Sequence, residues 1–211
     1  CVDGQSRLSP YLHLGQLSPQ RLAWMVKKSG LPNETTESFL EELIVRRELS
    51  DNFCLYDPGY DSPQGFTDWA RKTLDEHRDD TREYTYSLEE LETGRTHEQL
   101  WNCCQLDLAQ NGRLHGYLRM YWAKKILEWT ETPQQALDVM IDLNNRYAVD
   151  GRNPNSYSGI FWVLGRYDRA WGPERPVFGK IRFMSSDSTR KKLKLKGYLE
   201  RHSPKASDRL F

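Results

Sequence analysis

The sequence predicts an all-α domain. Apolar residues recur at helical spacing in several stretches, pairs of cap and first-turn residues mark helix starts, and no stretch alternates with period two over the length of a strand. With 211 residues the chain is long enough for one large domain, and no internal linker divides it. We therefore expect a helical domain over residues 1–184, followed by a basic, polar tail over residues 185–211 that is a candidate for disorder.

Start and stop signals place the first helices. Ser18 followed by Pro19 predicts a helix start, and Gly30 predicts its end. A longer helix is expected to follow Asn33–Thr36 and to run to Phe53. Its apolar stripe consists of Leu40, Leu43, Ile44 and Leu49.

The middle of the chain carries further helix starts after a loop with Pro-Gly turn chemistry. Thr67 precedes the helical pattern TDWARKTLDEHR. Two capping boxes, in which a hydroxyl and a Glu or Gln side chain satisfy backbone N–H groups reciprocally, predict two more starts. They are Ser87 with Glu90 and Thr96 with Gln99. The second of these helices is expected to end near Asn111-Gly112.

Residues 112–129, GRLHGYLRMYWAKKILEW, form a long helical pattern rich in aromatic residues. Trp122 and Trp129 are seven residues apart, so they share a helix face roughly 10 Å apart at about 1.5 Å rise per residue. Such a row suits a redox chromophore, and it also suits an ordinary hydrophobic core. The spacing alone favours the core.

The last part of the predicted domain combines a helix with a loop-rich segment. Thr132-Pro133 with Gln135 predicts the start of a helix that runs to about Val149. The segment 150–176 is rich in Gly, Asn and Pro and contains two tryptophans, Trp162 and Trp171. A dense polar set spans the junction: Asn144, Asn145, Arg146, Asp150, Arg152, Asn153 and Asn155. Caps and turns explain such residues as well as a binding loop does.

Composition limits the classes of function. Thirty acidic and thirty basic residues balance, so an anionic partner must meet a local patch rather than a global field. The four cysteines form no ligand cluster, so we expect no metal site. No apolar run approaches the roughly 18 residues that span a bilayer, and no signal peptide is recognisable. We expect no membrane contact, and a cytoplasmic protein, or a nuclear or organellar one in a eukaryote.

Two polar clusters are candidate sites on pattern alone. Ser6, Arg7 and Ser9 lie in a turn-forming stretch that suits a phosphate, although serine-rich turns are common without any ligand. Glu42 and Arg46 are an i,i+4 pair, which is typical of a solvated helix face stabilised by a few tenths of a kcal/mol.

Six stretches, in this order, resemble one known family. They are RLSPYLHLGQLSPQR, EELIVRRELSDNFC, LWNCCQ, HGYLRMYWAKKILEW, LNNRYAVDGRNPNSYSGIFW and RPVFGKIRFM. Together they are similar to the C-terminal, FAD-binding domain of the class II cyclobutane pyrimidine dimer photolyases. The resemblance reaches to about Met184 and implies an all-helical, multi-helix domain of the photolyase/cryptochrome type. The family's N-terminal α/β antenna domain has no counterpart in these 211 residues.

The resemblance implies a role for each matching residue. For FAD binding these are Ser6, Leu8, Ser9, Arg119, Asp150 and Asn144, the last facing flavin N5. For the electron relay that photoreduces the flavin they are Trp122 and Trp101, with Trp129 as a branch. For the flipped dimer they are Glu42, Met120 and Trp162, and the basic candidates for DNA include Arg46, Arg166, Lys180 and Arg182.

Three departures from the family's pattern stand in the matched region. Asn153 and Ser156 replace an aspartate and a glycine, and LGRYDRAW is one residue shorter, with Tyr167 and no histidine. These changes lie near the expected cofactor loop and lesion pocket.

The function expected from the resemblance is light-driven repair of pyrimidine dimers in UV-damaged DNA. The electron comes from reduced, anionic FAD, to which Arg119 supplies a nearby cation. We expect a monomer, and no antenna chromophore in this chain. Two alternatives remain: a cryptochrome-like FAD photoreceptor without repair activity, and a helical structural domain that has lost the cofactor. Retention of Glu42, Met120 and Trp162 favours repair, because a sensor needs no lesion contacts.

Overall fold

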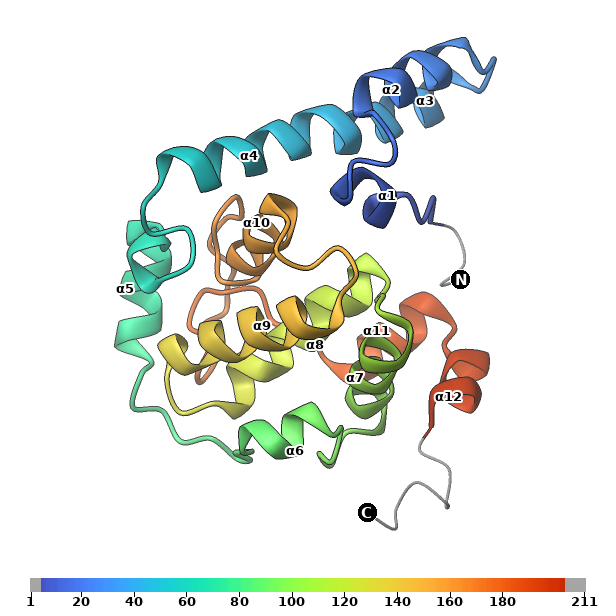
Figure 1. Ribbon diagram of the computed structural model, residues 1–211. Coiled ribbons are helices and arrows are strands. Elements are labelled where there is room, and N and C mark those ends of the chain that lie inside the picture. The colour runs from blue at the N-terminus through green and yellow to red at the C-terminus, as the bar shows by residue number, and fades with distance from the viewer. Residues whose placement is uncertain (1–4, 204–211) are drawn as a thin grey trace.

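The computed structural model describes residues 5–203 and confirms the all-α fold class. Within that range the backbone is helical with connecting loops, and its one β-type pairing is an isolated bridge between Arg175 and Gly179. Figure 1 shows α8 (Gly116–Trp129), α9 (Pro133–Tyr147) and α10 (Pro154–Val163) at the centre, with α4 (Arg47–Tyr56) running across α10. In the part of the chain that the structure describes, no helix is both long and apolar enough to cross a bilayer.

Several helix starts form as the sequence predicts. The helix α2 (Pro19–Lys28) is capped by Ser18, whose Oγ accepts from the Arg21 N–H at 3.3 Å. The predicted capping box of α6 (Leu88–Glu92) is complete, and Thr132 caps α9 through the Gln135 N–H at 3.1 Å. These matches follow because each cap joins groups only two or three residues apart.

One predicted capping box does not form. The helix α7 (Gln99–Asn111) begins at Gln99, with Glu98 as its N-cap. The Thr96 hydroxyl instead donates to Asn102 Oδ1 at 2.8 Å, and the Asn102 amide donates back to the Thr96 carbonyl at 2.8 Å. A side chain one turn into the helix therefore satisfies Thr96. The end of α7 is as expected, with Gly112 left-handed at φ 67°.

The helix predicted after Asn33 contains a π-turn. It runs as α3 (Asn33–Leu40), a π-helical turn at Glu41–Arg46 (η1), and then α4. Only Leu43 of its predicted apolar stripe is buried, while Ile44 and Leu49 are about two fifths exposed. The predicted stripe therefore does not form one buried face.

The remaining helices enclose the core. They are α1 (Ser9–His13), the 3₁₀ turn η2 (Pro63–Gly65), α5 (Asp68–Glu76), α11 (Ser186–Leu193) and α12 (Lys196–His202). Helix α8 is buried on nearly all sides because α7, α9, α10 and α11 pack around it. Its Lys124 is 1% exposed and donates through Nζ to the Val163 carbonyl, and burial lowers the pKa of this amine to about 7.

The stretch from residue 185, expected as a polar tail, is helical as far as the structure describes it. Leu193, Leu195 and Tyr198 are each less than a tenth exposed, and α12 packs on α7. The Tyr198 hydroxyl donates to Asp107 at 3.0 Å. The many lysines in this stretch make it look polar in the sequence, but its few apolar side chains pack into the core. Residues 204–211, the end of the predicted tail, lie outside the described range.

Candidate functional site

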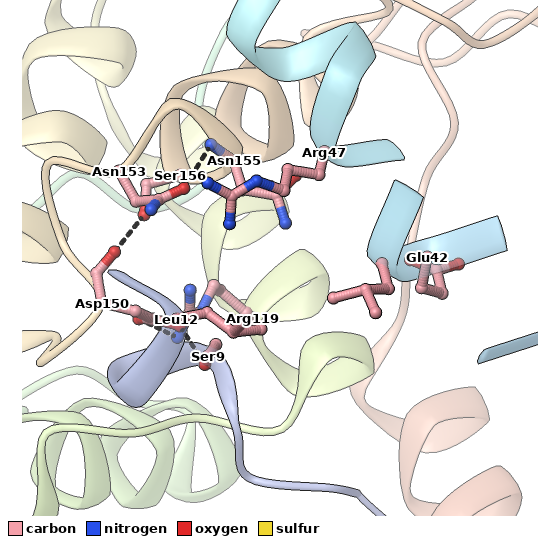
Figure 2. A pocket seen from close by; sticks show the side chains of 10 residues that line it. Ser9, Leu12, Glu42, Arg47, Arg119, Asp150, Asn153, Asn155 and Ser156 are labelled. Carbon is pink, nitrogen blue, oxygen red and sulfur yellow. Dashed lines mark hydrogen bonds and ion pairs between the residues drawn. The ribbon is translucent and has the colours of Figure 1, made fainter. Parts of the chain in front are cut away.

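A cavity of about 540 Å³ opens between the π-turn, α8, α9 and α10. Ligand pockets of proteins are typically 300–1,000 Å³, so this volume suits a cofactor. A smaller hollow of about 110 Å³ adjoins it and shares Glu42, Arg119, Asn155 and Ser156 (Figure 2). Together they form one cleft lined by segments far apart in the sequence.

An ion pair between Arg119 and Asp150 lines the smaller hollow (Figure 2). Arg119 of α8 donates through an Nη atom to Asp150 at 3.1 Å, and the Ser9 hydroxyl donates to the other Asp150 oxygen at 2.7 Å. Burial raises the pKa of Asp150, but the Arg119 charge and the two hydrogen bonds outweigh burial and leave that pKa below its ordinary value. Asp150 is therefore a carboxylate at neutral pH, and α1 is tied to the loop before α10.

Two buried polar atoms beside the cavity have no hydrogen-bond partner in the chain. They are Arg119 Nε and Asn144 Nδ2, and among the described residues only Thr67 Oγ1 shares this condition. Asn144 is 1% exposed, and its side chain lines the large cavity from α9. An unpaired buried donor costs roughly 1–3 kcal/mol, so two donors at one cavity indicate a site for a polar ligand.

The π-turn decides which side chains reach the cavity. Residues five apart face each other across a π-turn, and Arg46 accordingly pairs with Glu41 at 3.5 Å rather than with Glu42. Glu42 and Arg46 both line the large cavity. The i,i+4 pair expected from the sequence does not form, since Arg46 pairs with Glu41. Glu42 is exposed, as on a solvated face, and it also lines the cavity.

The predicted lesion-contacting residues gather at this cavity. Glu42, Met120 and Trp162 line it, and so does Arg182. The Arg46 guanidinium lies 4.9 Å from the centre of the Trp162 ring, and the Tyr167 ring lies 5.8 Å from it. Cation–π and aromatic contacts of this kind hold a flat side chain in a fixed orientation. Tyr167 belongs to the shortened loop and lines the cavity with φ 64°.

The tryptophans predicted to relay electrons form a continuous row. Trp122 lines the cavity, and its ring stacks on Trp101 with centres 6.4 Å apart and planes at 4°. Trp101 meets Trp129 edge to face at 5.5 Å. The gap between Trp122 and Trp129 on α8 is thus filled by a ring from α7. All three rings are 1% exposed or less.

Some predicted site residues lie away from the cavity lining. Ser6 and Leu8 precede α1 and line neither hollow, although Ser9 does. Arg166 donates to the Gly65 carbonyl at 2.7 Å and pairs with Asp57 at 3.1 Å. Lys180 pairs with Glu174 at 3.2 Å. Both cations thus have partners within the chain, which weakens their case as DNA contacts.

The residues that depart from the family's pattern have structural partners. Asn153 is the N-cap of α10, where its Oδ1 accepts from the Asn155 N–H at 2.9 Å. The Ser156 hydroxyl donates to the Asp150 carbonyl at 2.9 Å. An aspartate at position 153 would cap the helix equally well, so the change to asparagine keeps the loop in place.

Several residues of the site escaped the sequence analysis. Gln105 is fully buried and accepts from Trp122 Nε1 at 2.9 Å, while Trp101 Nε1 donates to the Trp122 carbonyl at 2.9 Å. Gln105 stands four residues after Trp101, a spacing that puts both on one helix face. Tyr86 and His97 continue the row beyond Trp129, at 5.3 Å and 5.4 Å from its ring, and no local pattern marks them.

Comparison with known proteins identifies relatives over almost the whole chain. No family model matches it. It is 53% identical over 196 residues to a deoxyribodipyrimidine photo-lyase of Arabidopsis thaliana, which covers 92% of this chain and 39% of the relative. It is 49% identical over 196 residues to the photo-lyase of Methanothermobacter thermautotrophicus, covering 93% and 43%. For the photo-lyase of Potorous tridactylus the identity is 47% over 205 residues, covering 96% and 38%.

The chain thus spans about two fifths of the length of these curated relatives. Roughly half of its residues are identical to theirs across more than nine tenths of its own length. On this similarity the chain belongs to the photolyase family.

Proposed function

We propose that this chain binds FAD and, in the light, repairs cyclobutane pyrimidine dimers in DNA, as a class II photolyase domain. The observation that carries the proposal is the cavity. It combines unpaired polar atoms of Arg119 and Asn144, the first ring of a tryptophan row, and a Trp162 face at its other wall. The relatives named deoxyribodipyrimidine photo-lyase support the activity, and the motif HGYLRMYWAKKILEW supports the class.

The residues of the cavity fit a flavin. Its ring edge offers carbonyl and nitrogen acceptors, and the cavity offers the two unsatisfied donors Arg119 Nε and Asn144 Nδ2. Arg119 would stabilise negative charge on the ring, because its Nε–H has no partner in the chain while an Nη atom pairs with Asp150. Ser9 would act indirectly, by fixing Asp150. When bound and reduced, the flavin supplies the light-excited electron that splits the cyclobutane ring.

The chain's own contribution to substrate binding is a surface for a pyrimidine dimer extruded from the duplex. Trp162 offers a flat face whose orientation Arg46 and Tyr167 maintain. Stacking on such a face is worth about 1–3 kcal/mol per base. Glu42 can exchange a hydrogen bond with a pyrimidine edge, and Met120 adds an adaptable apolar contact. A dimer pairs poorly in the duplex, so flipping it costs less than flipping normal bases.

The tryptophan row would carry electrons inward during photoreduction. Trp122 starts at the cavity wall, Trp101 stacks beside it, and Trp129 follows, so ring contacts connect the cavity to the far end of α8. Trp129, expected as a branch, continues the same row in this geometry. Reduced, anionic FAD as the working form is part of this proposal.

A cryptochrome-like photoreceptor is the second candidate, since it would use the same cofactor pocket and the same row. The cavity wall with Trp162, Glu42 and Arg46 favours repair, because a sensor has no use for a base-stacking face beside the cofactor.

The decisive experiment combines an absorbance spectrum with a repair assay. The purified chain, or the chain reconstituted with FAD, should show flavin absorbance, and blue light under reducing conditions should restore a dimer-containing oligonucleotide. Trp162→Ala should lower the affinity for dimer-containing DNA about 5–150-fold, which corresponds to about 1–3 kcal/mol. The affinity for undamaged DNA should fall much less. Absence of flavin binding would refute both candidates. Flavin binding without repair would refute the photolyase proposal and favour the photoreceptor.

A further inference from the structure

The outer end of the tryptophan row is a hydrogen-bonded tyrosine–histidine pair. The Tyr86 ring meets Trp129 edge to face at 5.3 Å, and the His97 ring lies 5.4 Å from the same indole. The Tyr86 hydroxyl lies 2.5 Å from His97 Nδ1. The buried row therefore ends in a phenol whose oxygen touches an imidazole nitrogen.

The phenol oxygen of Tyr86 has a second hydrogen-bond partner. The backbone N–H of His97 donates to the Tyr86 oxygen at 3.1 Å. Because the oxygen accepts there, the phenolic hydrogen can donate to His97 Nδ1 in the tautomer that carries the ring proton on Nε2. The 2.5 Å separation is within the reach required for direct proton transfer.

The surroundings differ on the two sides of this pair. Trp129 is 1% exposed, whereas the His97 residue is exposed and stacks at 3.8 Å on Tyr84, which is 41% exposed. Burial raises the pKa of Tyr86, and the His97 N–H only partly offsets this, so the phenol is protonated at neutral pH. A phenol that loses an electron becomes a strong acid, and its proton needs an acceptor at that moment.

We propose that His97 is the proton acceptor that makes Tyr86 the outer terminus of the row. In this step Tyr86 gives one electron to an oxidised Trp129, its O–H bond breaks, and the proton forms an N–H bond at His97 Nδ1. The products are a neutral Trp129, a neutral Tyr86 phenoxyl radical and a His97 imidazolium. In the cell the oxidation of Trp129 rests on the proposed flavin photochemistry, because it follows electron flow inward along the row.

Pulse radiolysis tests the step without any flavin. Azide radicals oxidise tryptophan in the purified chain, and the decay of the tryptophanyl absorbance into tyrosyl absorbance reports transfer from tyrosine. Other tryptophans, such as the exposed Trp24, are oxidised as well, so the relevant phase is the part of the conversion that is lost in Trp129→Phe. We expect this phase to slow about 2-fold or more in D₂O and to disappear in Tyr86→Phe. In His97→Gln, which keeps an acceptor but cannot hold the proton, the phase should slow at least 10-fold, and added imidazole should restore part of the rate in His97→Gly.

Tyr84→Phe is the matched control, since Tyr84 stacks on the same imidazole and should leave the phase unchanged. Thermal melts of each variant show whether the fold is retained. Conversion at the wild-type rate in His97→Gln with an unchanged isotope effect would overturn the role of His97. An unchanged phase in Tyr86→Phe would overturn the terminus itself. Neither outcome depends on flavin binding or repair, so failure here is distinguishable from failure of the proposed function.

Discussion

The tryptophan row and the cavity wall meet at α8, but the hydrogen bonding of their polar atoms differs. In the row, the N–H groups of Trp101 and Trp122 donate to a carbonyl and to Gln105, and the rings pack on one another. At the cavity wall, Asn144 Nδ2 and Arg119 Nε are buried without a partner. The N–H groups of Trp101 and Trp122 thus have partners within the protein, whereas two donors of the wall have none. Mutations should therefore separate stability from binding.

The largest effect on stability should come from the centre of the row. Trp101→Ala removes a ring that is fully buried between two others and should lower the free energy of unfolding by about 3–5 kcal/mol. Urea unfolding followed by circular dichroism measures this. Trp162→Ala, at the cavity, is the matched control and should cost far less. Equal losses in both variants would contradict the contrast between row and wall.

A smaller effect should come from the polar partner of the row. Gln105→Leu leaves the buried Trp122 N–H unsatisfied and should cost about 1–3 kcal/mol. Gln105→Met serves as a control for side-chain length and should cost a similar amount, since it also lacks a strong acceptor. Flavin binding should be nearly unchanged in both. A large loss of flavin affinity with unchanged stability would contradict this and would assign Gln105 to the flavin site.

The Arg119–Asp150 pair should contribute stability that acid removes. The folded-state pKa of Asp150 lies below the ordinary value of about 4, so the contribution is fully present above that value and is lost as pH falls through the folded-state pKa. Asp150→Asn should lose roughly 1 kcal/mol at neutral pH and should lack this part of the acid dependence. Unfolding free energies from pH 6 down to pH 2 measure both. Parallel curves for the two proteins would refute the pair's role.

The substitution with the smallest effect on stability should cause the largest loss of flavin affinity. Asn144→Leu removes a donor that has no partner, so the free energy of unfolding without flavin should change by less than about 1 kcal/mol. Flavin affinity should fall markedly, as measured by titration of the fluorescence of FAD. The neighbouring Asn145 is the control: its amide donates to Tyr157 at 3.1 Å and accepts from Arg152 at 2.8 Å. Asn145→Leu should therefore destabilise the fold, and the reverse ranking would refute the assignment of Asn144.

Much of the local structure could be predicted because its determinants are close in sequence. Ser18, Ser87 and Thr132 satisfy N–H groups two or three residues ahead, and Gly112 takes a left-handed conformation that other residues rarely adopt. Where a more distant side chain competes, the local pattern fails. Asn102 accepts hydrogen bonds from the N–H and hydroxyl of Thr96, six residues before it, and the predicted capping box does not form.

The candidate site could be predicted only in part. The resemblance names Arg119, Asn144 and Trp162, and the structure brings all three to one cavity. Neither the pattern nor the resemblance marks Gln105, Tyr86 or His97, because each acts through a partner on another segment. No sequence pattern marked the π-turn either, in which Arg46 pairs with Glu41, five residues before it.

By itself, the sequence determined the helical class and several helix ends, since caps and apolar spacing act over four residues or fewer. It also carried the motifs that relate the chain to photolyases. Only the tertiary structure decided that Trp101 of α7 fills the space between Trp122 and Trp129, and that Asn144 keeps an unpaired donor at a cavity. Burial and ring contacts between segments depend on how the helices pack around α8, and no local pattern encodes that packing.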